Sequence, residues 1–206
     1  MKKLTLALAG VLAIGTSASA QKIGVHANGI VSTLSASADG LTVNSQSRFS
    51  WKVGLQGELP LSGNFKLMPQ LNVLSKGGKF TEDGDGVTLK LTYVEVPLLF
   101  TYHFSKAFIG AGPSVSIGIG GEAVSTFDGE TEVTKIKFDG NEDPNDEMGH
   151  LRRTDVGIHF IGGVKLPKGL FVNAHYNLGV TSIVPGENQE GKMTNRYFGF
   201  GIGKNF

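Results

Sequence analysis

Four histidines are the residues of this sequence best suited to acid–base or metal chemistry. His26, His103, His159 and His175 each stand in a segment where apolar and polar residues alternate. Imidazole groups that converge can transfer protons or bind zinc. Because these four stand in different segments, we expect them at different heights and in hydrogen-bonded packing, which is the usual state of buried polar groups. The sequence therefore predicts no metal site and no cofactor.

An acidic loop over residues 139–147 carries oxygen ligands at alternate positions, as the first half of a calcium-binding loop does. The pattern fails at its turn glycine, where Pro144 stands, and at its twelfth position, where His150 stands. A solvated acidic loop is the simpler interpretation, and a weak contact with a divalent cation is the alternative. Residues 82–86 form a second acidic stretch, which Asp-Gly chemistry explains as a turn.

Catalytic and nucleotide-binding motifs are missing from the sequence. No Gly-x-Ser-x-Gly motif and no convincing grouping of serine, histidine and acid is present. Gly118–Gly121 precedes no predicted helix, so it is not a nucleotide fingerprint. Cysteine is absent, and a net charge of +1 leaves no basic footprint for nucleic acid. We therefore predict no catalytic residue, and an enzyme acting on lipid or peptide at a barrel rim is kept as an alternative.

The first twenty residues have the pattern of a secretory signal peptide. Lys2-Lys3 form a positive region, Leu4–Ile14 an apolar one, and Ala18–Ala20 an A-x-A cleavage site. The apolar stretch is short for a membrane-spanning helix. We expect cleavage after Ala20, which divides the chain into a signal peptide, residues 1–20, and an exported domain, residues 21–206.

Past the signal peptide, apolar residues recur at every second position, which predicts strands with one apolar face. Eight such segments follow one another, at residues 23–31, 49–59, 65–73, 94–102, 109–119, 156–166, 172–180 and 198–206. Their lengths suit tilted membrane-crossing strands. Short connectors at residues 60–64, 105–106 and 167–169 alternate with long polar ones at residues 35–46, 81–86, 124–153 and 185–193. The sequence therefore predicts an all-β fold, a closed antiparallel up-and-down transmembrane β-barrel with short periplasmic turns.

The polar faces of these segments decide which side meets lipid. They are rich in Gly, Ser, Asn, Gln and His, which suit a narrow interior, whereas a soluble barrel would carry many charges outside. A soluble exported barrel that binds an apolar ligand is the alternative. The charged residues on the strands are expected inside, where they must pair. The predicted lumen network comprises Lys52, Glu58, Glu95, His103, His175 and Arg196, with Lys66 beside them. An aromatic girdle is expected from Phe49, Trp51, Tyr102, Phe104, Tyr176 and Tyr197.

Three stretches of the sequence carry a resemblance to a known group of proteins. Tyr93–Leu99 reads aromatic-x-Glu-Val-Pro-Leu-Leu, Gly110–Pro113 reads Gly-x-Gly-Pro, and Leu67–Leu71, with Met-Pro-Gln for a usual Gln-Pro-Glu, precedes Lys76-Gly77. These stretches are similar to strands of the small outer-membrane barrels known as the porin family, or PorT-like group, of Bacteroidetes. The resemblance implies the outer membrane of a Gram-negative cell. It also implies that the barrel-insertion machinery recognises the terminal Phe206.

The function expected from the sequence is non-enzymatic. Eight strands leave a lumen that side chains just fill, so an open solute channel is not expected. The barrel would then serve envelope structure, or it would bind an extracellular ligand or protein through its long loops. The expected partners are outer-membrane lipid, the insertion machinery and that extracellular molecule, without nucleic acid.

Overall fold

The structure, a computed structural model, describes residues 22–38, 40–82, 85–140, 149–185 and 191–206. The predicted signal peptide lies outside the described residues, and its cleavage stays a prediction. In the part of the chain that is described, no helix has the length and apolar content needed to cross a membrane.

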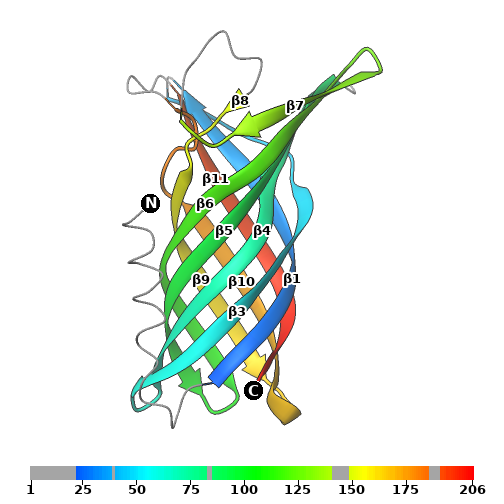
Figure 1. Ribbon diagram of the computed structural model, residues 1–206. Coiled ribbons are helices and arrows are strands. Elements are labelled where there is room, and N and C mark those ends of the chain that lie inside the picture. Colours follow the sequence, from blue (N-terminus) through cyan, green and yellow to red (C-terminus); the bar gives the residue numbers. More distant parts are fainter. Residues whose placement is uncertain (1–21, 39, 83–84, 141–148, 186–190) are drawn as a thin grey trace.

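Eight long strands form a closed antiparallel ring (Figure 1). Each strand of the ring pairs with its sequence neighbours in the ring, and the last pairs with the first, with Gly24 opposite Asn205. The predicted eight-stranded up-and-down barrel is therefore confirmed. Its strands are β1 (Lys22–Ala38), β3 (Arg48–Ser62), β4 (Phe65–Glu82), β5 (Asp85–Phe104), β6 (Ala107–Phe127), β9 (Thr154–Lys165), β10 (Leu170–Gly179) and β11 (Gly191–Asn205).

The period-two pattern of the sequence becomes two faces of the barrel wall. On β11, Phe200 and Ile202 point outward and are 64% and 67% exposed. On β10, which pairs with β11, Asn173 and Asn177 point inward and are buried. A wall with apolar side chains outside and polar ones inside suits lipid and cannot be stable in water. The structure therefore places these side chains on the faces that the alternation predicts.

Three short turns join the strands at one end of the barrel. Gly63-Asn64 joins β3 to β4, Ser105-Lys106 joins β5 to β6, and η2 (Pro167–Gly169) joins β9 to β10. Gly63 and Ser105 adopt positive φ angles of 56° and 53°, which reverse the chain within two residues. The start of β1 and the end of β11 lie at this same end. Short turns mark the periplasmic side of such barrels.

At the other end, the long polar connectors fold differently from the prediction. Much of their described length is strand: β4 reaches Glu82, β5 begins at Asp85, and β6 continues to Phe127. β2 (Leu41–Asn44) pairs with β1, β7 (Glu130–Lys137) pairs with β6, and β8 (Gly149–His150) pairs with β7. A strand in water needs hydrogen-bond partners but no apolar face, so the alternation that marks the lipid band stops while the pairing continues.

The paired residues beyond the lipid band form what we call the extracellular sheet: residues 77–82 of β4, 85–92 of β5, 120–127 of β6, and all of β7. The pairing of these four segments is continuous from one to the next. The sheet stands above the ring, with the β6–β7 hairpin projecting farthest from it at the upper right (Figure 1).

Leu98 provides a direct test of the lipid-facing side. It lies midway along the membrane part of β5, points outward and is 37% exposed. Replacing Leu98 with arginine should cost about 2–4 kcal/mol, because a charge then lies near the bilayer midplane. The measurement is urea unfolding of the protein in lipid vesicles.

Thr88→Arg is the matched control for this prediction. Thr88 lies on the same strand and has the same outward parity, but it is part of the extracellular sheet. Its replacement should change stability little, because the new charge stays in water. Equal unfolding free energies for the two variants would show that the apolar face of β5 does not meet lipid.

Candidate functional site: the closed lumen

An ion-pair network lies at the centre of the lumen. The ammonium of Lys76 on β4 donates to Asp155 Oδ2 on β9 at 3.1 Å and lies 3.5 Å from Glu95 Oε2 on β5. It also donates to Ser116 Oγ at 2.8 Å. Lys76, Glu95 and Asp155 are at most 2% exposed. Three charged groups from three strands are thus held together away from water, which is favourable only with this complete set of partners.

Tyr197 extends this central network across the full width of the barrel. Its hydroxyl, on β11, donates to Glu95 Oε1 at 2.6 Å. β5 and β11 lie opposite each other in the ring, four strands apart in either direction. Asn195 of β11 also donates to Asp155 Oδ2, at 2.9 Å. These bonds place side chains directly across the lumen at this height.

A second network closes the periplasmic end. Glu58 of β3 accepts from Lys66 of β4 at 2.7 Å and from Lys165 of β9 at 2.9 Å. Asn205 of β11 donates to the other oxygen of Glu58 at 3.0 Å. β3 and β9 are again opposite strands of the ring. Because Glu58 is 2% exposed and the lysines about a quarter exposed, the carboxylate sits inside while both ammonium groups reach toward water.

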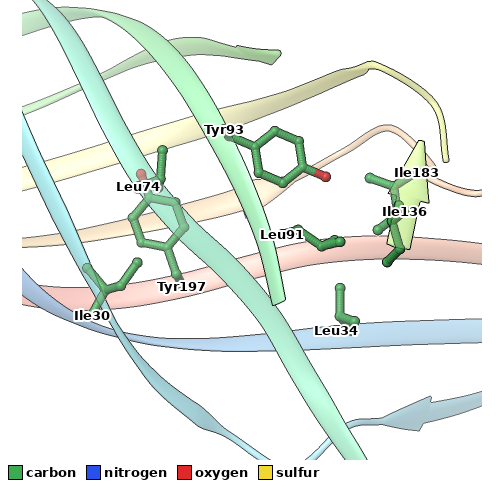
Figure 2. Packing of buried hydrophobic residues seen from close by; sticks show 8 residues of the cluster. All are labelled: Ile30, Leu34, Leu74, Leu91, Tyr93, Ile136, Ile183 and Tyr197. Atoms are coloured by element: carbon green, nitrogen blue, oxygen red, sulfur yellow. The ribbon is translucent and has the colours of Figure 1, made fainter. Parts of the chain in front are cut away.

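Apolar side chains also pack inside the barrel, contrary to the small and neutral polar interior expected from the sequence. Met68, Leu99, Phe108 and Ile161 form one buried cluster. A larger cluster lies toward the extracellular mouth, where Leu91 and Tyr93 of β5 approach Ile136 of β7 and Ile183 of the β10–β11 connection (Figure 2). Residues from outside the ring thus help to close the mouth. The expectation was wrong because an inward position needs volume filled, and any well-packed side chain can fill it.

Two of the four histidines lie together in the barrel, and the other two have separate partners. The rings of His159 and His175 stack with centroids 5.5 Å apart, and His159 Nδ1 lies 3.3 Å from the Tyr197 hydroxyl. His103 stacks on Phe108, with centroids 5.5 Å apart, in the lower part of the lumen. His26 bonds to Asn28 at 2.8 Å. Among the described residues, no three His, Cys, Asp or Glu side chains are arranged to hold a metal ion.

Five of the six predicted lumen residues point into the barrel: Lys52, Glu58, Glu95, His103 and His175. Only the two glutamates make ion pairs with lysine there. Lys52, 1% exposed, lies over the Tyr197 ring with its ammonium 5.7 Å from the centroid. His103 and His175 bond to neighbours on their own strands, Thr101 and Asn173.

The sixth prediction, Arg196, is wrong, and so is the placement of Tyr197 in the outer aromatic girdle. Arg196 pairs across β10 and β1 with Leu178 and Thr33, and it shares the outward parity of Phe198. Tyr197 has the opposite parity and is 1% exposed. Strict alternation along β11 requires both placements, since neighbouring side chains on a strand point to opposite faces.

Lys76 and Asp155 are network members that the sequence reasoning missed. Each stands on the inward parity of its strand: Lys76 follows Asn72 by four residues, and Asp155 precedes His159 by four. Their inward parity is the feature of the sequence that could have identified them as lumen residues.

The acidic loop is described only at its edge. Asp139 Oδ1 lies 2.7 Å from His150 Nδ1, so the two residues that bracket the loop contact each other. Residues 141–148, which carry most of the ligands of the calcium alternative, lie outside the described residues.

The charges of the central lumen balance within the described chain. Lys52 and Lys76 face Glu95 and Asp155, two cations against two anions, all at most 2% exposed. Such a set can hold opposite walls of a barrel together, and it occupies the space that a solute would need. The site is therefore a plug made of the barrel's own side chains.

Comparison with known proteins agrees with this architecture. Residues 18–184 match the family described as outer membrane protein beta-barrel domain. Neisserial surface protein A is similar in structure with a TM-score of 0.53 at 11% identity, over 91% of this chain and 100% of that one.

Two further solved structures resemble the chain more weakly. Ail, the attachment invasion locus protein of Yersinia pestis, in complex with a heparin analogue, has a TM-score of 0.43 at 10% identity, over 90% of this chain and 99% of that one. The outer membrane protease OmpT of Escherichia coli has a TM-score of 0.44 at 10% identity, over 90% and 96% of the two chains. No curated protein matches the sequence.

The likeness to neisserial surface protein A shows the fold alone, whereas the family match covers most of the sequence. With its closed ring, its outward apolar face and this match, the chain belongs to the outer membrane protein β-barrel domain family and is an integral outer-membrane protein.

Proposed function

We propose that this protein is a non-enzymatic outer-membrane scaffold that binds an extended segment of another protein with its extracellular sheet. The lumen is filled by its own ion pairs and apolar clusters, so the part of the chain that remains available to a partner is the sheet above the ring. This is a narrower form of the loop-mediated binding that the sequence predicts.

The observation that carries the proposal is apolar surface exposed where there is no lipid to cover it. Val133 on β7 is 55% exposed on one face of the sheet, and Phe127 at the hairpin tip is 54% exposed on the other face. On β2, which pairs with β1, Leu41 and Val43 are 75% and 61% exposed, and Val43 lines one groove with Phe127. Apolar side chains exposed in the water-facing part of a protein mark surfaces that bind other molecules, and both faces of the β6–β7 hairpin carry one.

The edge of β7 supplies the hydrogen-bonding groups for such a partner. Glu130–Lys135 pair with β6 on one side, whereas β8 pairs with β7 only at Ile136 and Lys137. Within the described ranges, the outer edge of Glu130–Lys135 pairs with no strand. An open strand edge adds a strand from another chain through backbone hydrogen bonds, and alternate side chains set the preference.

A selection experiment tests the proposal. The protein, reconstituted in lipid nanodiscs, is used to select binders from a random peptide library, with empty nanodiscs as the background. We expect enrichment of peptides that alternate apolar and polar residues, because a strand added beside Val133 presents every second side chain to the same face.

Val133→Lys is the decisive variant and Leu61→Lys its control. Leu61 is equally exposed, at 56%, but lies at the periplasmic end of β3. The selected peptides should lose binding to Val133→Lys and keep it to Leu61→Lys. Selection of nothing above background, or equal binding to both variants, would refute the proposal.

We further propose that export uses a signal peptide cleaved after Ala20, and that Phe206 serves recognition by the insertion machinery. N-terminal sequencing of the protein purified from outer membranes should begin at Gln21, and any other first residue would contradict the cleavage site. Membership of the PorT-like group remains a proposal that rests on the three stretches of sequence described above.

A further inference from the structure

An arginine lies on the outer wall of the barrel where the apolar belt ends. Arg196 stands directly above Phe198, Phe200 and Ile202 in the outward row of β11. Its neighbours across the two flanking strands are Thr33 on β1 and Leu178 on β10. A cation on the lipid-facing side is tolerated near the interface, where its head group reaches the polar layer. Arg196 therefore lies at the level where lipid head groups begin.

A groove in the outer wall surrounds this arginine. It has a volume of about 350 Å³ and is lined by residues of four segments: β1, β2, β11 and the end of β10 with the residue that follows it. Four of its lining residues are hydroxyl side chains, Ser35, Ser37, Thr42 and Thr194. Ser37 and Thr42 bond to each other at 2.9 Å. The lining of the groove thus combines hydroxyl groups from β1, β2 and β11 with apolar side chains at Leu178 and Val180.

The described residues give the groove a positive charge. Its charged lining residues are Lys192 and Arg196, and none of its described lining residues is a carboxylate. The Nε of Arg196 is buried without a hydrogen-bond partner among the described residues. On another side of the barrel, Lys90 at a comparable outward position is neutralised by Glu122 at 2.8 Å. A buried guanidinium nitrogen without a partner is costly, so the groove favours an anionic acceptor.

Phosphate is the anion that fits these groups. The guanidinium fork forms paired hydrogen bonds with phosphate oxygens, and an ammonium and hydroxyl groups complete such sites. The groove lies next to the outward apolar belt, which acyl chains cover. A membrane lipid is therefore the source of phosphate that the position of the groove favours. Basic pockets at the membrane surface of this kind bind lipid head groups.

We propose that the groove around Arg196 and Lys192 binds the phosphate of a lipid in the outer leaflet, with the acyl chains lying on Phe198 and the apolar belt. The site is separate from the extracellular sheet and independent of the function proposed for it.

Native mass spectrometry of the purified barrel tests this assignment with two short-chain lipids. Phosphatidic acid exposes a phosphate monoester, whereas phosphatidylcholine carries a masked phosphodiester. We expect one phosphatidic acid molecule to bind with about tenfold higher affinity than phosphatidylcholine. A factor of about ten corresponds to one well-made charged contact. Arg196→Gln should abolish this preference, and Lys192→Gln, at the exposed rim, should reduce it. Lys90→Gln should leave it unchanged, because Lys90 is already paired.

Two outcomes would overturn the assignment. Equal retention of both lipids by the unchanged protein would show that the groove does not select phosphate. Displacement of phosphatidic acid by inorganic phosphate at similar concentration would show a free-anion site and not a lipid site. Thermal unfolding of each variant in phosphatidylcholine separates loss of binding from loss of folding, and Lys192→Gln decides the matter if Arg196→Gln does not fold.

Discussion

Replacing Lys76 with methionine is expected to destabilise the barrel by about 3–5 kcal/mol, the usual cost of removing one partner from a buried ion pair. Methionine fills nearly the same space, so the effect comes from charge. Glu95 and Asp155 lose the ammonium that lies 3.5 and 3.1 Å from them, in a lumen where they are at most 2% exposed. Urea unfolding in lipid vesicles, followed by the fluorescence of Trp51, measures the change.

Lys90→Met is the control that isolates burial. Lys90 and Glu122 are closer together, at 2.8 Å, but both are more than 40% exposed. An exposed pair contributes about 0–1 kcal/mol, so this variant should unfold almost as the unchanged protein does. A second variant, Lys76→Met with Asp155→Asn, should regain part of the loss because it removes one of the two stranded anions. Similar unfolding free energies for Lys76→Met and Lys90→Met would mean that the lumen is hydrated and that the central network is not a buried one.

The purified protein is expected to show no large, stable conductance in planar lipid bilayers. Water-filled pores are made by barrels of roughly sixteen or more strands, and this ring has eight. The bonds from Glu95 to Tyr197 and from Glu58 to Lys165 each join opposite strands, so two layers of side chains cross the lumen. The apolar cluster at Leu91, Ile136 and Ile183 adds a third barrier near the mouth.

A general porin added to the same bilayer is the positive control for this conductance measurement. Reproducible nanosiemens-scale openings from the folded protein, lost when the sample is denatured beforehand, would contradict the closed lumen. They would require either a shared pore between several copies of the chain or a rearrangement of both ion-pair layers.

The faces of the strands were readable from the sequence because alternation is a local property. Each inward or outward position follows from its neighbour two residues away, so the placement of Glu95, His159 and Asn177 inside needed no knowledge of the fold. At Arg196 and Tyr197 the type of the side chain and the parity of the strand disagree, and the structure follows the parity.

The contacts between side chains across the lumen could not be predicted from local alternation. Lys76 meets Asp155 only because β4 and β9 curve toward each other in the closed ring, at a relative height set by the tilt of the strands. The two residues are 79 positions apart in the sequence, and no local pattern predicts their contact. The extracellular sheet escaped prediction for a different reason: its strands lie in water and need no apolar periodicity, so β7 and the ends of β4 and β5 read as polar loops.

The fluorescence of Trp51 reports, without any substitution, whether the apolar wall of the barrel faces lipid. It is the only tryptophan of the chain, points outward from β3 between Phe49 and Val53, and is 47% exposed. In vesicles of brominated lipid, a tryptophan that contacts acyl chains is quenched by the bromine atoms. We expect strong quenching of Trp51 by brominated lipid and little quenching by aqueous iodide. Quenching by iodide with none by brominated lipid would show that this wall lies in water and not in lipid.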